Sequence, residues 1–507
     1  MDTDSKSSIK NTAWLKLRSG SDIRGTDGQL TDARVEKLGY AFACWLAQRL
    51  GKTPDALRLA VGRDARASGE RLMAALTRGI TAADSDVLDC GLCAAPALFM
   101  TVQPGPDQAD GAVMVTAAVH VPELNGLKFF TREGGLEPAD MTEILSLAAR
   151  SEVPERLVVP CDANALYFEA LRRVAARYLE DDALRPLLGM KVIVDARGSV
   201  GAAYARFLEA LGVETDGSLH PENDGETLAV PNPEDPATLD AMARAVRARR
   251  ADLGVIFNAD GDRAAIVDET GRAVSQNRLI ALIAAMLLEA TPGSTFVTDS
   301  VTSTGLSAFI AEWGGVHYRF KRGYRNVIDE AIRLNAEGID CPLAIETSGH
   351  AAFRENGFLD DGMYLATRVI CEALDRKREG QTLWSLIDDL QEPVESVEIR
   401  LPILDFEDWE PEEEAQEIVE KLLSHTLTNP EWQMAPDNRE GVRITFNLDG
   451  GVNNAWLQLR MSVHDPVMVL NAESDIPGGV KRILAELYDL IGDTKMLELE
   501  PLREAIG

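Results

Sequence analysis

The chain is organised around one stretch, Val115-Thr116-Ala117-Ala118-Val119-His120-Val121-Pro122-Glu123-Leu124-Asn125-Gly126-Leu127-Lys128-Phe129-Phe130. Residues Gly111 to Val115 have the composition of a buried strand, small residues then form a tight turn, and a second strand follows. Open α/β sheets usually bind ligands at the carboxyl ends of their strands. The turn is therefore a candidate ligand site, but the methyl group of Ala118 at its centre can do no chemistry.

Length and charge limit the classes of function. The 507 residues predict several domains. A formal net charge of −31 at pH 7 argues against nucleic-acid and anionic-membrane partners, because both need basic protein faces. A small anionic ligand is still compatible with this charge, since a few arginines can focus positive potential locally. The hydrophobic content of 45% is ordinary for a globular protein.

Targeting signals are not evident, and we expect a cytoplasmic protein. The segment Met1 to Lys16 is polar and charged and lacks the apolar core of a signal peptide. The longest apolar run, Leu279 to Leu288, is shorter than the roughly 20 residues that span a bilayer. The six cysteines are scattered, which predicts reduced thiols, with Cys90 and Cys93 as core or loop residues.

Strands and helices alternate through most of the chain. The predicted strands are Leu57 to Val61, Lys191 to Asp195 and Thr295 to Thr298, and their helices are Ser68 to Ile80, one ending at Leu211 and one ending at Trp313. Three such strand–turn–helix units at broad spacing predict three related α/β domains.

The carboxyl-terminal part has a different pattern. Apolar and polar residues partly alternate there, which predicts antiparallel strands at Val394 to Ile403, Val442 to Leu448 and Ala455 to Leu459. An acidic helical segment, Asp405 to Ser424, lies between the first two strands. We therefore expect a separate α+β domain at this end.

A polar turn, Asn258-Ala259-Asp260-Gly261-Asp262-Arg263, follows the buried strand Leu253 to Phe257. Oxygen-bearing side chains at alternating positions can point at one hard cation such as Mg²⁺, which prefers oxygen ligands. The alternative is a plain Asp-Gly turn, since Ala264 to Val267 resumes as a strand. The spacing leaves both readings open.

Two further turns carry polar side chains. Glu346-Thr347-Ser348-Gly349-His350 combines a carboxylate, hydroxyls and an imidazole that can hydrogen-bond sugar hydroxyls. Arg460-Met461-Ser462-Val463-His464-Asp465-Pro466 places an arginine and a hydroxyl beside backbone amides, which suits a phosphate dianion. Taken alone, each pattern also fits a structural turn.

Taken together, these turns resemble the loops of the α-D-phosphohexomutases, the phosphoglucomutase/phosphomannomutase family. The resemblance covers nearly the whole chain, and the motifs occur in the family's order. The other matching segments are Arg18-Ser19-Gly20-Ser21-Asp22-Ile23-Arg24-Gly25, Gly62-Arg63-Asp64-Ala65-Arg66 with Ser68-Gly69, Asn125-Gly126-Leu127-Lys128, Lys321-Arg322-Gly323-Tyr324-Arg325 and Phe358-Leu359-Asp360-Asp361-Gly362.

The resemblance implies a four-domain, heart-shaped architecture in the α/β class. Three related α/β domains would cover residues 1–155, 156–271 and 272–392, and an α+β domain would cover 393–507. Each domain would contribute one loop to a central cleft. In that family a phosphoserine donates its phosphate to a hexose 1- or 6-phosphate, and the bisphosphate intermediate reorients and returns the other phosphate. Mg²⁺ bridges the phosphoserine and three aspartates.

The resemblance also implies roles for residues at matching positions. Arg24 and Lys128 would contact the transferring phosphate, with Lys128 as a proton shuttle. Asn258, Asp260 and Asp262 would hold the metal, with Arg263 beside them. Glu346, Ser348 and His350 would contact the sugar. The other phosphate would be bound by Arg460, Ser462 and His464, assisted by Lys321 and Arg325.

The active loop departs from the family's T-A-S-H pattern. Thr116-Ala117-Ala118-Val119 aligns Ala118 with the serine and Val119 with the histidine, and Asn258 aligns with the first aspartate of the metal loop. Alanine removes the phosphoryl carrier and one metal-ligand oxygen, and asparagine offers an oxygen without charge. We therefore expect weakened Mg²⁺ binding and disabled phosphoryl transfer.

Three functional hypotheses follow. We favour a non-catalytic or regulatory protein that binds hexose phosphates as small-molecule ligands. The second is a phosphotransferase with altered chemistry, in which hexose 1,6-bisphosphate is the donor or His120 carries the phosphate, although His120 also fits a structural turn residue. The third is a structural or partner-binding protein with a relic cleft. The sequence identifies no protein partner and does not separate glucose, mannose and glucosamine phosphates.

Overall fold

The computed structural model describes residues 13–105, 108–153, 159–179, 184–221, 232–274, 276–404, 411–462 and 466–507. The chain divides into two compact units. The first unit comprises Met1–Ser275, Ser348–Ala351 and Leu359–Leu383, and the second comprises Gln276–Thr347, Ala352–Phe358 and Trp384–Gly507. No helix of the described residues is long and apolar enough to cross a membrane.

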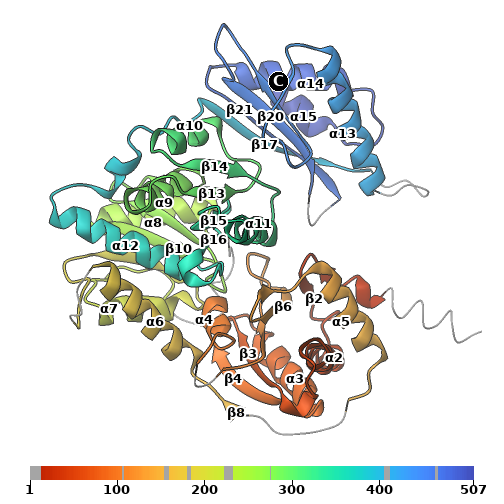
Figure 1. The fold of residues 1–507 in the computed structure, drawn as a ribbon, viewed down its shortest axis with the longest axis vertical. Helices are drawn as coiled ribbons and strands as arrows, with labels where there is room; N and C mark the ends of the chain where they lie inside the picture. Colours follow the sequence, from red (N-terminus) through yellow and green to blue (C-terminus); the bar gives the residue numbers. More distant parts are fainter. Residues whose placement is uncertain are drawn as a thin grey trace, which may run out of the picture. The chain divides into compact units, whose positions relative to one another are not determined.

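The amino-terminal sheet of the first unit has eight strands in the order β1-β2-β6-β5-β3-β4-β8, with β7 paired to β6 (Figure 1). These strands are β1 (Arg18–Ser19), β2 (Asp22–Thr26), β3 (Arg58–Arg63), β4 (Asp86–Leu92), β5 (Gly111–Val115), β6 (Leu124–Thr131), β7 (Gly134–Gly135) and β8 (Val159–Pro160). Strand β3 is parallel to β5 and ends opposite it, at the pair Arg63 and Val115. The loops that follow β3 and β5 therefore leave the same edge of the sheet.

Helices cover both faces of this sheet. Helices α2 (Asp32–Leu50), α3 (Gly69–Ala82) and α5 (Pro138–Arg150) share one buried cluster with β3, β5 and β6, which includes Phe42, Leu76, Phe129 and Ile144. Helix α4 (Ala95–Met100) contacts β3 and β5, and α6 (Ala163–Tyr178) packs on α4. A short 3₁₀ helix, Pro54–Ala56, leads into β3.

The second sheet of this unit has the order β12-β11-β10-β9. Its strands are β9 (Val192–Asp195), β10 (Leu253–Phe257), β11 (Ala264–Asp268) and β12 (Ala273–Val274), and its helices are α7 (Gly201–Ala210), α8 (Pro236–Arg249) and α12 (Gly362–Arg378). Every residue of β10 is buried, which explains its continuous apolar run. Strand β10 is antiparallel to β11, so residues 258–263 form the connection at the carboxyl end of β10.

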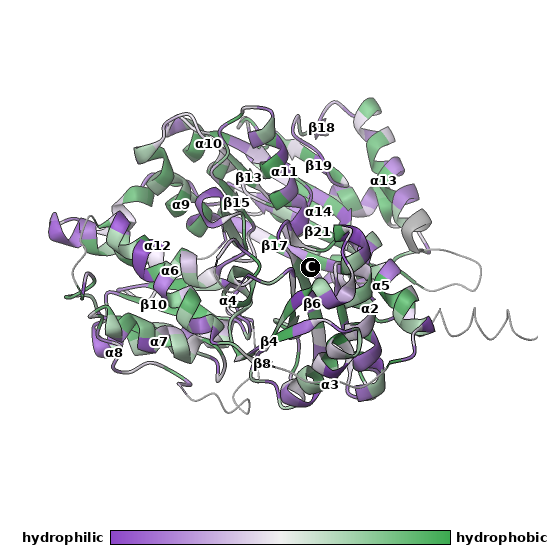
Figure 2. Cartoon of the chain, turned by 60° about the horizontal axis from the view of Figure 1, so that its bottom comes forward, coloured by the Kyte–Doolittle hydropathy of each residue, from purple (hydrophilic) through white to green (hydrophobic). Residues whose placement is uncertain are grey.

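The second unit begins with a sheet in the order β14-β13-β15-β16. Its strands are β13 (Thr295–Thr298), β14 (Val316–Arg319), β15 (Leu343–Ile345) and β16 (Ala351–Phe353), its helices are α9 (Asn277–Ala290), α10 (Thr304–Glu312) and α11 (Tyr324–Ala336), and its 3₁₀ turns are Arg354–Asn356 and Leu383–Ile387. The longest apolar run of the sequence lies inside α9, which is mostly hydrophobic in Figure 2. For comparison, one end of α12 is hydrophilic in the same view. That run is therefore a buried helix of an α/β layer.

The carboxyl-terminal sheet has the order β17-β21-β20-β19-β18, and all of its pairs are antiparallel. Its elements are β17 (Glu395–Pro402), α13 (Pro411–Thr428), β18 (Gln433–Met434), β19 (Val442–Phe446), β20 (Ala455–Met461), β21 (Val467–Ser474), α14 (Gly479–Ile491) and α15 (Glu500–Ile506). The predicted strands correspond to β17, β19 and β20. Strand β21, which pairs with both β17 and β20, was not predicted. The predicted architecture of three α/β domains followed by an α+β domain is confirmed.

Cys90 and Cys93 behave as core residues rather than as reactive thiols. All six cysteines lie within the described ranges and none forms a disulfide there, and Cys90 and Cys93 are buried. Burial raises the pKa of both thiols, that of Cys93 to about 12. Because the thiolate is the reactive form, burial argues against a redox or nucleophilic role for this pair.

Candidate functional site

The loop after β5 is fixed by the buried side chain of Arg66. The guanidinium donates hydrogen bonds to four backbone carbonyl oxygens of the loop, those of Ala118 (2.9 Å), His120 (2.9 Å), Val121 (2.7 Å) and Leu124 (2.9 Å). Its Nε donates to Oδ2 of Asp64 at 3.0 Å, and both side chains of this ion pair are fully buried. Charge-assisted bonds of this kind are stronger than neutral ones, so the loop has one well-defined shape.

Ala118 lies at the centre of this fixed loop. Its backbone is left-handed, with φ of +52°, and only 2% of the residue is exposed. Its N–H donates to Oγ1 of Thr116 at 2.9 Å, and that hydroxyl donates to Oδ2 of Asp64 at 2.7 Å. A left-handed conformation costs a residue with a Cβ about 1–2 kcal/mol, which the surrounding hydrogen bonds offset. The loop is thus held in a special conformation around a side chain that cannot carry a phosphoryl group.

Arg24 and Gly126 bring strand β2 close to the loop. Arg24 donates to the carbonyl oxygen of Ala117 at 2.6 Å and to Oδ2 of Asp22 at 2.9 Å. It pairs in register with Gly126 of β6, where a Cβ would lie 2.4 Å from the Ile23 carbonyl oxygen. Glycine is therefore required at position 126 for this close approach. The side chain of His120, the alternative phosphate carrier, is exposed.

Lys128 joins the loop region to the turn after β10. Its Nζ lies 2.8 Å from Oδ2 of Asp260 and 2.5 Å from Oδ2 of Asp262, and only 10% of its side chain is exposed. The turn needs Gly261 in the left-handed region, with φ of +72°. It is tied to the rest of the unit by the carbonyl oxygen of Asp260, which accepts from the N–H of Ala95 at 2.9 Å.

Asn258 uses both ends of its carboxamide inside the turn. Its Nδ2 donates to Oδ1 of Asp262 at 2.6 Å, and its Oδ1 accepts from the backbone N–H of Arg263 at 3.2 Å. Burial raises the pKa of Asp260, and the charge of Asp262 adds to this effect. Burial also opposes ionisation of Asp262, but the positive charges of Lys128, His350 and Arg263 together outweigh it and hold the pKa of Asp262 well below its usual range.

These residues do not fit a divalent cation. Mg²⁺ needs near-octahedral oxygen ligands, whereas Asp262 faces an ammonium on Oδ2 and an amide NH₂ on Oδ1. Ala118 has no side-chain oxygen, and the oxygen of Asn258 faces a backbone donor. Within the described ranges, no three His, Cys, Asp or Glu side chains are grouped so as to hold a metal. The turn is better described as an ion-paired structural element.

The predicted sugar-binding residues of the first unit lie beside this turn. His350 Nε2 accepts from Nε of Arg263 at 2.9 Å, and its Nδ1 lies 3.2 Å from Oγ of Ser348. Nε2 is also 3.7 Å from Oδ2 of Asp262. The structure therefore brings Arg263, Ser348 and His350 together with the aspartates of the turn.

The second unit holds Glu346, which was predicted to bind sugar hydroxyls, and the two basic residues predicted to assist at the phosphate. Glu346 is buried, and its Oε1 accepts from the backbone N–H of Gly323 at 2.6 Å, so the turn after β15 contacts the loop before α11. Lys321 of that loop is exposed. Arg325 pairs with Asp329 one helical turn later, at 2.8 Å. Glu346 is thus adjacent to the loop that carries the two basic residues.

Arg460 lies at the end of β20 and is only 4% exposed. Its Nη1 donates to the Met461 carbonyl oxygen at 3.4 Å, and its Nε is 4.0 Å from Oε2 of Glu440. Among the described residues, Nε has no hydrogen-bond partner. The backbone N–H of Ser462 bonds to the Val467 carbonyl oxygen at 2.9 Å. The predicted residue His464 lies outside the described residues.

Several residues that shape these sites had no role assigned from sequence. Asp64 and Arg66 belong to a segment whose match to the family was noted, but only the fold shows that β3 ends beside β5. Glu440 was missed as well, although its Oε2 accepts from Oγ of Ser300 at 2.5 Å and from the backbone N–H of Arg322 at 3.1 Å. No local pattern marks Glu440, because its partners are more than a hundred residues away in the chain.

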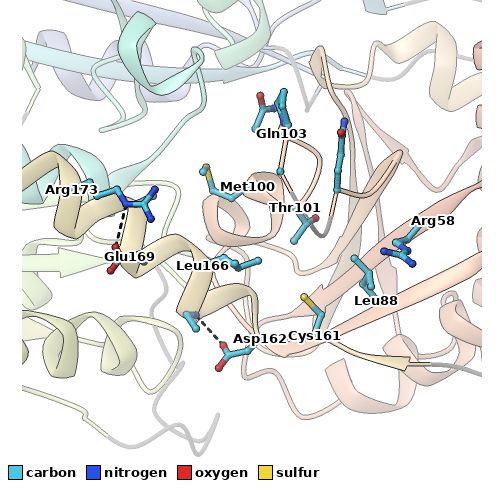
Figure 3. A pocket seen from close by; sticks show the side chains of 15 residues that line it. Arg58, Leu88, Met100, Thr101, Gln103, Cys161, Asp162, Leu166, Glu169 and Arg173 are labelled. Carbon is cyan, nitrogen blue, oxygen red and sulfur yellow. Dashed lines mark hydrogen bonds and ion pairs between the residues drawn. The ribbon is translucent and has the colours of Figure 1, made fainter.

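A cavity of about 880 Å³ lies elsewhere in the first unit, where β4, α4 and α6 meet (Figure 3). Met100, Leu166 and Arg173 are among the side chains around it, and Arg173 is paired with Glu169 at 3.2 Å. None of the residues predicted to bind sugar, phosphate or metal lines this cavity. It is therefore separate from the candidate site.

Known proteins resemble this chain over most of its length. Family models described as phosphoglucomutase/phosphomannomutase, alpha/beta/alpha domains I, II and III, match residues 16–154, 165–271 and 275–394. A phosphomannomutase/phosphoglucomutase of Pseudomonas aeruginosa is 27% identical over 472 residues, which cover 91% of this chain and 92% of that protein. A phosphoglucosamine mutase of Parasynechococcus marenigrum is 30% identical, with coverages of 70% and 75%.

Solved structures share the fold. A phosphoglucomutase/phosphomannomutase family protein from Burkholderia thailandensis has a TM-score of 0.78 and 24% identity, with coverage of 94% of this chain and 97% of that chain. A serine-to-alanine variant of N-acetylphosphoglucosamine mutase from Aspergillus fumigatus, in complex with glucose 1,6-bisphosphate, has a TM-score of 0.57 and 13% identity, with coverages of 96% and 98%. The family models and the sequence relatives place this chain in the phosphoglucomutase/phosphomannomutase family, the α-D-phosphohexomutases.

Proposed function

We propose that this protein binds hexose phosphates without phosphoserine chemistry and acts as a non-catalytic or regulatory member of its family. The observation that carries the proposal is Ala118, a methyl-bearing residue at the centre of a loop fixed by Arg66. Serine-borne phosphoryl transfer needs a hydroxyl to accept the phosphate, and this position has none. The loop has a defined conformation, but the side chain of Ala118 offers no nucleophile.

Arg460 supports retained phosphate recognition. A buried guanidinium with an unsatisfied Nε is costly, and its ion pair with Glu440 is long at 4.0 Å. A phosphate dianion would satisfy such a donor with charge-assisted hydrogen bonds. Glu346 offers a buried carboxylate next to the loop that carries Lys321 and Arg325, and a carboxylate of this kind suits sugar hydroxyls.

A family-fold protein gives a precedent for binding without a serine hydroxyl. The Aspergillus fumigatus mutase variant carries alanine in place of a serine and was solved with glucose 1,6-bisphosphate. In that protein the substitution is compatible with binding of the bisphosphate. We extend this to the present chain as a proposal, with a hexose monophosphate or bisphosphate as the ligand.

The test measures binding and turnover on the same preparation. Isothermal titration and thermal shift with glucose 1-phosphate, mannose 1-phosphate and glucose 1,6-bisphosphate should show saturable binding, because a ligand of the native state raises the melting temperature. A coupled mutase assay should show no turnover. Turnover at rates typical of an enzyme, about 1–10³ s⁻¹, would contradict the proposal. Absence of binding to all three ligands would favour a structural protein with a relic cleft.

The double variant Ala118→Ser with Asn258→Asp tests which positions carry the loss. Mutase activity in this variant would show that these two positions carry the loss, whereas continued inactivity would shift the cause to Val119 and the rest of the loop. The single variants serve as its controls. Intact-mass measurement of the wild-type chain after incubation with glucose 1,6-bisphosphate tests the altered chemistry. An acid-labile phosphate adduct would point to His120 as carrier and would overturn the non-catalytic proposal.

A further inference from the structure

We propose that the Lys128 ammonium permanently takes the place of a divalent cation between Asp260 and Asp262, which closes this turn to Mg²⁺. The inference rests on contacts inside the first unit and does not depend on whether the protein binds sugar phosphates. It assigns Lys128 a charge-compensating role in place of a proton-transfer role.

The contacts around the two carboxylates carry the inference. Lys128 Nζ bridges Oδ2 of Asp260 at 2.8 Å and Oδ2 of Asp262 at 2.5 Å. The amide of Asn258 donates to the other oxygen of Asp262 at 2.6 Å. Both oxygens of Asp262 and Oδ2 of Asp260 therefore already face positively polarised N–H groups, and Oδ1 of Asp260 is the one oxygen of the two carboxylates without such a contact among the described residues.

Charge and size both oppose a second cation in this place. Mg²⁺ binds carboxylate oxygens at roughly 2.0–2.1 Å in near-octahedral geometry. An ion bound to the same two Oδ2 atoms would lie within a few ångströms of the ammonium, in a buried site where like charges repel strongly. Asp260 is fully buried and Asp262 nearly so. Entry of Mg²⁺ would thus require the lysine to leave.

The backbone holds Lys128 in this position. It lies inside β6, where it pairs in register with Met114 of β5. With 10% of its side chain exposed, it has little access to water at this site. Moving the ammonium away would remove the cation that contacts both buried carboxylates and leave Asp262 with the more distant Arg263 (3.9 Å) and His350 (3.7 Å), which is unfavourable. We therefore expect the lysine to remain paired at any physiological Mg²⁺ concentration.

Electron paramagnetic resonance of Mn²⁺, used as a probe for Mg²⁺, tests this directly, because the signal of free Mn²⁺ falls when the ion binds. The full chain is titrated as wild type, as Asn258→Asp, as Lys128→Met with Asn258→Asp, and as Lys495→Met, in which an exposed lysine is removed as the matched control. We expect no saturable binding below 1 mM for the wild type and for Lys495→Met. The Lys128→Met/Asn258→Asp double variant should gain one site that is at least tenfold tighter.

Thermal unfolding gives a second readout that does not need the double variant to fold as well as the wild type. The wild-type melting temperature should be the same in EDTA and in Mg²⁺, and that of the double variant should rise with Mg²⁺. The inference would be overturned if the wild type bound Mn²⁺ at a single site with a dissociation constant in the micromolar range and Asp260→Asn abolished that binding. Failure of the double variant to gain a Mn²⁺ site, with its Mn²⁺ titration and melting temperature unchanged from those of the wild type, would overturn it as well.

Discussion

The charged side chains near Ala118 and those near the end of β20 are satisfied in different ways. In the first unit, Arg66 is paired with Asp64, and Lys128 is paired with Asp260, at distances of 3.0 and 2.8 Å. In the second unit, Arg460 is equally buried, yet its Nε has no hydrogen-bond partner among the described residues. The two regions thus differ in whether the protein itself supplies hydrogen-bond partners for all donors of its buried cations.

This difference distinguishes buried cations that stabilise the fold from buried cations that are available to bind an anion. A buried cation that is fully paired within the protein contributes to stability and leaves no donor for a ligand. A buried cation with an unused donor costs stability until an anion satisfies it. Around Ala118 the buried cations are paired within the protein, and the buried Oδ1 atom of Asp260 has no hydrogen-bond partner among the described residues. Around Arg460 a cationic donor is unused, as the proposed phosphate site requires. Substitutions in the two regions should affect different measurements.

The largest expected effect is that of Arg66→Met. The substitution removes the partner of the buried Asp64 carboxylate and all four bonds to the loop carbonyl oxygens. We expect the free energy of unfolding to fall by about 4–5 kcal/mol, at the upper end for loss of one partner of a buried pair. Denaturant unfolding measures it. Arg482→Met, which breaks an exposed pair with Asp449, is the matched control and should cost less than about 1 kcal/mol.

Lys128→Met is expected to follow, with a loss of about 3 kcal/mol, because it leaves Asp260 and Asp262 buried without their shared counter-charge. The effect should be smaller than that of Arg66→Met, since one carboxylate can protonate and the pair can then share a hydrogen bond. Lys495→Met controls for loss of a lysine. Equal stability of Lys128→Met and the wild type would show that the region around Ala118 is not closed by this ammonium.

Arg460→Met should have the opposite signature. Because Nε has no partner, its removal should leave the free energy of unfolding nearly unchanged or slightly raised. Affinity for glucose 1,6-bisphosphate should fall by about 10- to 150-fold, as expected for one to two charge-assisted hydrogen bonds worth about 1.5–3 kcal/mol in total. Isothermal titration measures the affinity. A loss of stability similar to that of Lys128→Met would abolish the distinction between the two regions.

The sequence predicted the elements better than the contacts between them. Alternation of strands and helices identified β3, β9, β13 and the helices after them, because a continuous apolar run followed by helical periodicity is a local signal. Strand β21 was missed: the predicted turn Arg460 to Pro466 ends just before it, and the residues that form it were assigned to no element. Its place between β17 and β20 depends on pairing with residues far away in the chain.

The site was predictable as a set of residues but not as a network. The family resemblance placed Lys128 at a transferring phosphate and Asp260 and Asp262 at a metal, and the sequence had no means to show that these groups pair with one another. Such pairing needs the relative placement of two sheets, and 132 residues separate Lys128 from Asp260. The role of Arg66 in holding the loop likewise follows from the register of β3 and β5, which no local motif encodes.

The smallest expected effect is that of Ala118→Gly, which asks whether the loop conformation depends on residue 118 itself. Glycine relieves the left-handed backbone by about 1–2 kcal/mol, but it loses about 0.5–1 kcal/mol through the greater freedom of the unfolded chain. The net change in the free energy of unfolding should therefore be a stabilisation of no more than about 1.5 kcal/mol. Ala117→Gly is the matched control, because Ala117 does not have a positive φ and its replacement should only destabilise. A destabilisation by Ala118→Gly as large as that by Ala117→Gly would mean that the methyl group, rather than the Arg66 side chain, holds the loop in place.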